Sequence, residues 1–259
     1  MIGSLFVTGP AGTGKSTFCG AFKEWLTRSD YDSIIVNLDP GAEYLPYEPE
    51  IDIREFISLN DIMSEYSLGP NGAQVVASDL LIDNAEKIRS KLDLYEDYYV
   101  IFDTPGQIEL FSFRPSSPML VERLAGKKGM LAFIADSVVA QTPSGFISEK
   151  MLFGSVYSRF YIPMLFVLNK IDLIGDEVVD KIKSWEDDPD LLYGDFLDEK
   201  GEMVKDYFLN IINAFKESDI ITKISPVSSK DMFGFDDIYS DMSNYFQGGE
   251  DTDTEYRDE

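Results

Sequence analysis

Four residues near the beginning of the sequence have the spacing of a phosphate-binding loop. Gly9, Gly14, Lys15 and Ser16 match the pattern G-x-x-x-x-G-K-[ST], between an apolar run and a segment of helical spacing. Glycines let backbone N–H groups converge on phosphate oxygens, and a helix N-terminus favours the same negative charge. The lysine is expected to reach the β- and γ-phosphates, and the serine hydroxyl to bind Mg²⁺. The other residues expected to contact the phosphates are Ala11, Gly12, Thr13 and Thr17.

A second polar group, Asp103-Thr104-Pro105-Gly106-Gln107, follows the apolar run 98–102. A carboxylate at the end of a parallel strand lies where such sheets bind ligands, so Asp103 is expected near the Mg²⁺. Gly106 can bring its N–H to the γ-phosphate, and Gln107 can orient a water molecule. A Pro-Gly turn with an incidental acid is the alternative, which the preceding phosphate-loop pattern disfavours.

A third group, Asn169-Lys170-Ile171-Asp172, ends another apolar run. The carboxylate of Asp172 can accept hydrogen bonds from both N1–H and the 2-amino group of guanine. Adenine has no such amine, so the carboxylate would be left unpaired, and unmatched polar groups reject the wrong ligand. Lys170 can lie along the purine face, and Asn169 can hold the loop. Following the two other motifs in this order, the group predicts a guanine nucleotide site.

Ser228 and Ser229 follow the last apolar run of the chain. A backbone N–H in this segment could reach guanine O6. A capped turn that opens the last helix explains the same residues nearly as well, so both interpretations stay open.

The elements that must hold these motifs alternate between strands and helices. Strands are expected at 4–8, 33–38, 98–102, 130–135, 163–168 and 224–227, and helices at 16–26, 73–92, 145–160 and 202–215. This alternation predicts an α/β fold with a doubly wound, mostly parallel sheet, which is the P-loop NTPase architecture, with helical insertions. We expect one GTPase domain over 1–246, with insertions at about 41–72 and 175–222. Residues 247–259 are acidic and nearly free of aliphatic side chains, which predicts a disordered tail.

Composition excludes several other functions. The net charge is −25, from 22 basic and 47 acidic residues, which disfavours direct binding to nucleic acid or to anionic membranes. The sequence has no histidine and one cysteine, so a histidine base and an intramolecular disulfide are both excluded. No run is long enough to span a bilayer, and the first strand leaves no room for a signal peptide. We therefore expect a cytoplasmic protein.

The triplet Gly69-Pro70-Asn71 lies in the first insertion. Together with the three motifs and Asp39-Pro40, it resembles the GPN-loop GTPases over nearly the whole chain. The size resembles that of archaeal single-domain members. The resemblance implies a homodimer that hydrolyses GTP to GDP and phosphate with Mg²⁺, and in which the triplet enters the partner's active site. Proline fixes φ and glycine permits close approach, so the triplet would present Asn71 on a stiff segment. A plain surface turn is the alternative.

The resemblance also suggests roles for individual residues. Asp39 could act as general base or as a magnesium ligand, and the sequence does not separate these roles. Glu109 is a candidate helper, and Arg54 is the alternative to Asn71 as the group that stabilises charge. The expected catalytic residues are Lys15, Asp39, Asn71, Asp103 and Gln107, and the expected metal ligands are Ser16, Asp39 and Asp103.

Two functions are compatible with these motifs. One is a GTP hydrolase, and the other is a GTP-gated assembly factor in which hydrolysis resets a binding surface. The resemblance favours the second as well, because eukaryotic members of the family are linked to RNA polymerase assembly; the client of this protein is unknown. A small-molecule kinase or a deviant Walker A ATPase is disfavoured by the guanine motif, and Pro10 stands where those ATPases carry an additional lysine.

Overall fold

One parallel sheet organises the chain. The computed structural model describes residues 1–199, 205–217 and 223–248. Seven strands of this part pair in the order β3-β2-β4-β1-β5-β6-β7, and every neighbouring pair is parallel. The strands are β1 Gly3–Thr8, β2 Ser33–Asn37, β3 Ile51–Asp52, β4 Tyr99–Asp103, β5 Gly129–Asp136, β6 Met164–Asn169 and β7 Ile224–Val227. Six of them confirm expected strands. β3 is missing from the prediction because two residues are too short to show a hydrophobic pattern.

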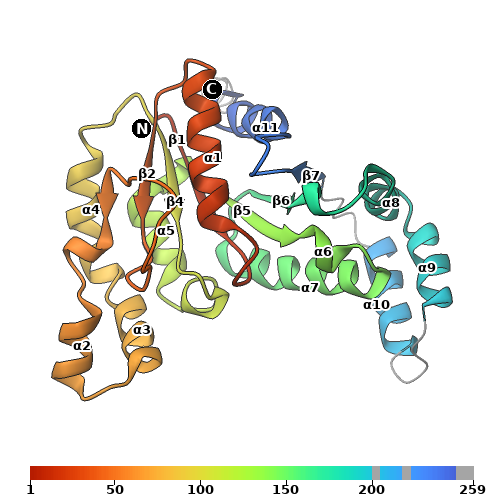
Figure 1. Ribbon diagram of the computed structural model, residues 1–259, viewed down its shortest axis with the longest axis horizontal. Helices are drawn as coiled ribbons and strands as arrows, with labels where there is room; N and C mark the ends of the chain where they lie inside the picture. Colours follow the sequence, from red (N-terminus) through yellow and green to blue (C-terminus); the bar gives the residue numbers. More distant parts are fainter. Residues whose placement is uncertain (200–204, 218–222, 249–259) are drawn as a thin grey trace, which may run out of the picture.

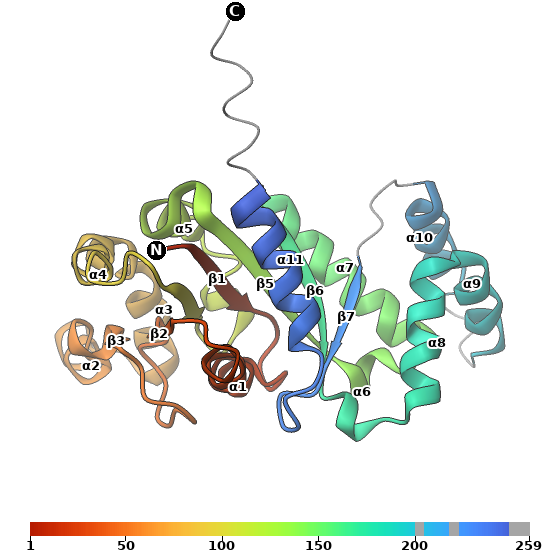
Figure 2. The same ribbon diagram turned by 90° about the horizontal axis from the view of Figure 1, so that it is seen from above.

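Helices cover both faces of the sheet, which confirms the doubly wound α/β fold (Figures 1 and 2). The α-helices are α1 Lys15–Arg28, α2 Leu59–Tyr66, α3 Pro70–Asp79, α4 Ala85–Leu92, α5 Ser117–Ala125, α6 Ser137–Ala140, α7 Pro143–Phe160, α8 Asp176–Asp187, α9 Pro189–Asp198, α10 Lys205–Glu217 and α11 Phe235–Gly248. The short 3₁₀ helices are η1 Ile53–Glu55, η2 Ile82–Asn84, η3 Ile108–Leu110, η4 Gly126–Lys128 and η5 Ile171–Leu173. Among the described residues, no helix is both long and apolar enough to cross a bilayer.

The core has two apolar layers, one on each face of the sheet. Leu5 and Val7 of β1 face α1 and α11, whereas Phe6 between them faces the opposite layer. There the Phe6 ring stacks on Phe102 of β4, with 4.2 Å between ring centroids. Strands covered on both faces are buried along their length, and continuous apolar runs are the sequence pattern of such strands.

The register brings the polar strand ends to one edge of the sheet. Asn37 at the end of β2 lies beside Asp103 at the end of β4. Asp136 at the end of β5 lies beside Asn169 at the end of β6. The carboxyl ends of parallel strands form the ligand-binding edge in open α/β sheets. The three predicted motifs are therefore carried by neighbouring loops at this edge.

The two predicted insertions lie at opposite ends of the sheet. Residues 41–72 contain β3, η1, α2 and the start of α3, at the β3 edge, while α8, α9 and α10 lie near the β7 edge (Figure 1). The helix expected over 73–92 is wrong as one element: α3 ends at Asp79, and η2 and α4 follow. The side-chain amide of Asn84 donates a hydrogen bond to the backbone carbonyl of Leu80 at 2.9 Å. A side chain therefore satisfies a carbonyl at the end of α3. Helix α11 ends at Gly248, two residues into the predicted tail, and the remainder of the tail lies outside the described residues.

Candidate functional site

The phosphate loop joins β1 to α1, as predicted, and its glycines adopt conformations that other residues rarely take. Gly9, Gly12 and Gly14 have φ of 144°, 81° and 93°. Gly14 immediately precedes the first turn of α1, which ends the loop at a helix N-terminus. Ala11 and Thr17 are exposed, and Thr13 is buried with its hydroxyl donating to Pro10 O at 3.0 Å. This loop has the form of an anion-binding site at a helix N-terminus.

Lys15 is held inside the loop by backbone carbonyls. Its Nζ donates to the carbonyl oxygens of Gly9, Pro10 and Gly106, at 2.9, 2.8 and 2.7 Å. Burial lowers the pKa of Lys15 to about 8, against the attraction of Asp103 and Asp39. The Gly106 contact joins the phosphate loop to the loop after β4, so two of the predicted motifs meet at this ammonium group.

Asp103 is buried and has one oxygen free for a ligand. Its Oδ2 accepts a hydrogen bond from the Tyr47 hydroxyl at 2.6 Å, whereas Oδ1 has no hydrogen-bond partner in the described part of the chain. Burial raises the pKa of Asp103, and the hydroxyls of Ser16 and Tyr47 lower it. An unpartnered carboxylate oxygen near a serine hydroxyl fits Mg²⁺, which usually takes one or two carboxylates and completes its shell with phosphates and water. The described residues contain no cluster of three or more carboxylates or thiols.

Asp39 connects the loop after β2 to the loop after β4. Its Oδ2 accepts from the N–H of Gly106 at 3.0 Å, and its Oδ1 accepts from the N–H of Gly41 at 2.8 Å. Asn37 anchors the backbone of Asp39 through two further hydrogen bonds. The N–H of Gly106, which the sequence assigns to the γ-phosphate, therefore has a carboxylate partner in this structure.

Several predicted catalytic residues lie on the surface, away from this hydrogen-bonded cluster. Gln107 is exposed at the beginning of η3, and Glu109 is exposed within it. Asn71 is exposed in the first turn of α3, where Gly69 is the N-cap and Pro70 opens the helix. The triplet thus lies at the beginning of a helix and not at the tip of a loop. Proline suits the first helical position, because the N–H that it lacks would have no partner there.

Arg54, the alternative to Asn71, is already paired. Its guanidinium donates to both carboxylate oxygens of Asp52, at 2.6–3.0 Å, and to the carbonyl of Ala42 at 2.8 Å. A cavity of about 440 Å³ lies beside it, bordered by Pro40, Gly41, Pro70 and Gln74 among others. Because Pro70 borders the same cavity as Pro40 and Gly41, the triplet lies near the loop that carries Asp39.

The third motif is tied to the phosphate loop by two side chains. Asn169 Nδ2 donates to Thr13 O at 2.9 Å, and Lys170 Nζ donates to Gly12 O at 2.6 Å. The other end of the Asn169 amide accepts from Ser229, whose hydroxyl lies 2.8 Å away. Lys170 also forms a salt bridge of 2.6 Å with Asp136. The loops after β1, β5, β6 and β7 are therefore joined directly.

Asp172 is oriented by the loop after β7. Its Oδ1 accepts from the Ser228 hydroxyl at 3.2 Å, and the Lys230 ammonium lies 3.9 Å from Oδ2. Ser228 and Ser229 thus lie against the third motif. Their hydroxyls contact Asp172 and Asn169.

Two residues of the site, Tyr47 and Asp136, are missing from the prediction. Asp136 ends a buried strand as Asp103 does, so the strand-end pattern could have identified it. Tyr47 comes from a segment of irregular structure between β2 and β3, and no local pattern indicates that it reaches Asp103.

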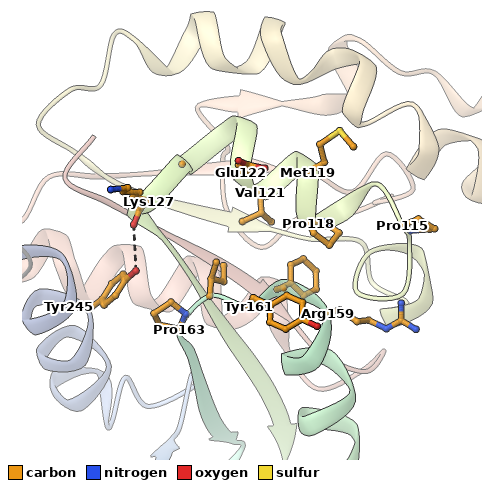
Figure 3. Close-up of a pocket in the computed structure, with 13 residues that line it drawn as sticks. Pro115, Pro118, Met119, Val121, Glu122, Lys127, Arg159, Tyr161, Pro163 and Tyr245 are labelled. Atoms are coloured by element: carbon orange, nitrogen blue, oxygen red, sulfur yellow. Dashed lines mark hydrogen bonds between the residues drawn. The ribbon is translucent and has the colours of Figure 1, made fainter.

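A second cavity, of about 740 Å³, lies at the opposite edge of the sheet (Figure 3). It is lined by Pro118, Val121, Arg159, Tyr161 and Tyr245 among others, and Tyr245 donates to Lys127 O at 3.5 Å. Its lining includes residues that directly precede β5 and β6, so it lies at the end of the sheet away from the nucleotide-binding loops.

Comparisons with known proteins agree with this geometry. Residues 7–248 match a family described as conserved hypothetical ATP binding protein. A GTPase of Pyrococcus abyssi, solved in its apo form, has a TM-score of 0.79 and 28% identity, and the match covers 95% of this chain and 98% of that one.

Sequence relatives carry more specific names. GPN-loop GTPase 3 of Dictyostelium discoideum is 32% identical over 250 residues, covering 95% of this chain and 87% of that protein. GPN-loop GTPase 3 of Yarrowia lipolytica is 40% identical over 177 residues, covering 67% of this chain and 65% of that protein. GPN-loop GTPase QQT1 of Arabidopsis thaliana is 38% identical over 179 residues, covering 68% of this chain and 60% of that protein. The match thus spans less than two thirds of the last two relatives. The chain belongs to the GPN-loop GTPase family.

Proposed function

We propose that this protein hydrolyses GTP to GDP and phosphate with Mg²⁺. The observation that carries the proposal is the joining of the phosphate loop to the third motif through Asn169 and Lys170, with Asp103 unpartnered at one oxygen. A phosphate site and a purine site are then held at a fixed separation. The carboxylate of Asp172, oriented by Ser228, matches the two donors of guanine.

Each residue of the cluster has a role in this proposal. Lys15 exchanges its carbonyl partners for the β- and γ-phosphates and stabilises the charge that develops there. Ser16 and Asp103 would hold the Mg²⁺, which would neutralise charge on the phosphates. Asp39, fixed by two backbone N–H groups, and the exposed Gln107 would place the attacking water. The link from Asp39 through Gly106 to Lys15 supports a nucleotide-dependent switch, because a γ-phosphate would compete for these contacts.

We further propose that the protein is a homodimer in which Asn71 completes the partner's active site. Two observations support this. Asn71 is exposed within its own chain, and Gly69 has an ordinary φ of −75° with no atom within 4 Å of an added Cβ. Nothing in the described part of its own chain therefore requires glycine at 69. Close approach of a second chain would require it.

The first test is nucleotide preference: purified protein is assayed with GTP and with ATP, each with Mg²⁺ and with EDTA. Hydrolysis of GTP alone, dependent on Mg²⁺, is expected. Equal rates with ATP would contradict the guanine assignment.

The second test mixes two inactive variants, Lys15→Ala and Asn71→Ala, under conditions that exchange subunits. Half of the dimers should then be mixed, each with one intact site, so about a quarter of the wild-type rate returns. Loss of one such donor typically costs roughly a hundredfold in rate, so the recovery is easy to detect. The control replaces the second variant with Lys15→Ala/Asn71→Ala, which restores nothing. No recovery despite proven exchange would show that Asn71 does not act across the dimer.

A further inference from the structure

Helix α7 carries a buried carboxylate that none of the roles above explains. Glu149 is only 6% exposed, and its Oε2 has no hydrogen-bond partner in the described part of the chain. Burying an unpaired carboxylate is costly, so a group of this kind usually shifts its pKa and keeps its proton. Its place in the fold is next to Asp136, which supports the third motif.

A continuous set of contacts leads from Glu149 to the phosphate loop. The backbone N–H of Asp136 stabilises the Glu149 carboxylate. One oxygen of the Asp136 side chain accepts from the N–H of Val138 at 2.9 Å, which caps α6, and the other lies 2.6 Å from the ammonium of Lys170. Lys170 in turn donates to Gly12 O at 2.6 Å. Asp136 therefore lies between the buried carboxylate and the lysine of the third motif.

The protonation of Glu149 is set by burial and by this neighbour. Its pKa is raised to about 7, mainly by burial and to a lesser extent by the negative charge of Asp136, while the backbone N–H of Asp136 lowers it. Helix α6, packed on α7, has no titratable side chain. The side chain next to it on α7, Lys150, is directed to Glu186 of α8 at 2.7 Å.

Charged groups on the other elements packed against α7 have partners of their own or lie at the surface. Glu199, which follows α9, accepts from Ser144 in the first turn of α7. Asp195 of α9 accepts from Trp185 and pairs with Lys181, and Asp206 of α10 is exposed. The charge that acts on Glu149 is therefore that of Asp136.

We propose that Glu149 is a positioning residue for the base-recognition loop and acts on Lys170 through Asp136. This inference rests on the proposed guanine site. With its proton, Glu149 is neutral, and Asp136 holds Lys170 against the phosphate loop. Loss of the proton places a second negative charge behind Asp136, and like charges repel. The carboxylate that holds Lys170 is then displaced, and guanine nucleotides bind less tightly.

The experiment compares GDP binding by calorimetry in the wild type, Glu149→Gln and Glu186→Gln, from about pH 5.5 to about pH 8.5. Glutamine keeps the shape and stays neutral, so Glu149→Gln should match the wild type at low pH and bind on the order of fivefold more tightly at about pH 8. Glu186→Gln is the matched control, a partly buried glutamate of the neighbouring helix that contacts Lys150, and should keep the wild-type pH profile. Ionisation of the GDP phosphate and of Lys15 is common to all three proteins and cancels in the ratios.

The outcomes separate this inference from the function on which it rests. If the wild type binds GDP no more tightly than ADP at any pH, the guanine site itself is wrong. If GDP is preferred but the ratio of Glu149→Gln to wild type is the same at every pH, the positioning role is overturned. Should Glu149→Gln not fold, Asp136→Asn provides the test, because it must abolish the affinity change around pH 7 that Glu186→Gln retains.

Discussion

Nucleotide binding is predicted to give a proton back to Lys15. In the free protein, burial lowers the pKa of this ammonium group to about 8. Bound phosphates would place negative charge beside it, and an adjacent opposite charge favours the protonated form of a lysine. The perturbation is therefore the nucleotide itself, and the quantity measured is the number of protons taken up on binding.

The size of the uptake follows from the two pKa values. With a pKa of about 8, roughly half of the Lys15 side chains have lost the proton at pH 8, and roughly nine tenths at pH 9. If the phosphates return the pKa to the ordinary value of 10.5, binding takes up about half a proton at pH 8 and about 0.9 at pH 9. By linkage, the affinity for GDP falls by about tenfold between pH 7 and pH 9.

The assay is calorimetry of GDP binding in two buffers that differ in ionisation enthalpy. Lys15→Arg keeps the positive charge but does not titrate, so its uptake at pH 9 should vanish. Lys23→Arg is the matched control, a half-buried lysine of the same helix that pairs with Glu50, and should keep the wild-type uptake. No uptake in the wild type at pH 9, or equal uptake in Lys15→Arg, would refute the reasoning.

Four further predictions follow from the same contacts. Asp172→Asn should weaken GTP binding by roughly tenfold to a hundredfold and shift preference toward xanthosine triphosphate, as measured by competition binding. Tyr47→Phe leaves Asp103 Oδ2 without its donor and should lower the free energy of unfolding by about 1–3 kcal/mol in urea denaturation. Glu149→Gln should raise that free energy by up to about 3 kcal/mol at pH 8 and leave it unchanged at pH 4. The reason is that the folded-state pKa of about 7 lies above the ordinary 4.5, so wild-type stability falls as pH rises between these values. Ending the chain after Gly248 should leave the melting temperature and GTPase rate nearly unchanged, because the removed residues are acidic and lack aliphatic side chains.

The parts of the fold and site that follow from local chemistry are those that the sequence predicts. Glycine at 9, 12 and 14 is needed by the backbone of the loop itself, and the apolar runs are needed by strands covered on both faces. The loop of Asn169 directly follows such a run, so the order of the motifs places it at the same edge as the phosphate loop. These features depend on residues adjacent in the chain.

Features that depend on distant contacts escape the prediction. The hydroxyl of Tyr47 reaches Asp103 across 56 residues, and nothing near Tyr47 indicates it. The break after Asp79 is missed for a different reason, because the spacing of the segment is helical throughout and does not mark the interruption. In the sequence, nothing distinguishes Glu149 from the other acidic residues, and only the packing of α7 shows that it is buried. The contact of Tyr47 and the burial of Glu149 thus arise from tertiary structure, and the local sequence pattern does not predict them.

The amide of Asn169 has a consequence for how a nucleotide leaves. Its nitrogen holds the phosphate loop at Thr13 and its oxygen holds Ser229, so one planar group fastens both ends of the site. Glycine at 14 makes room for this amide, because a Cβ there would lie 2.8 Å from the Asn169 nitrogen. Rotation of this amide would release Thr13 and Ser229 together, and Lys170 holds the phosphate loop as well through Gly12 O. We therefore expect that the phosphate loop and the purine loops loosen together when a nucleotide leaves.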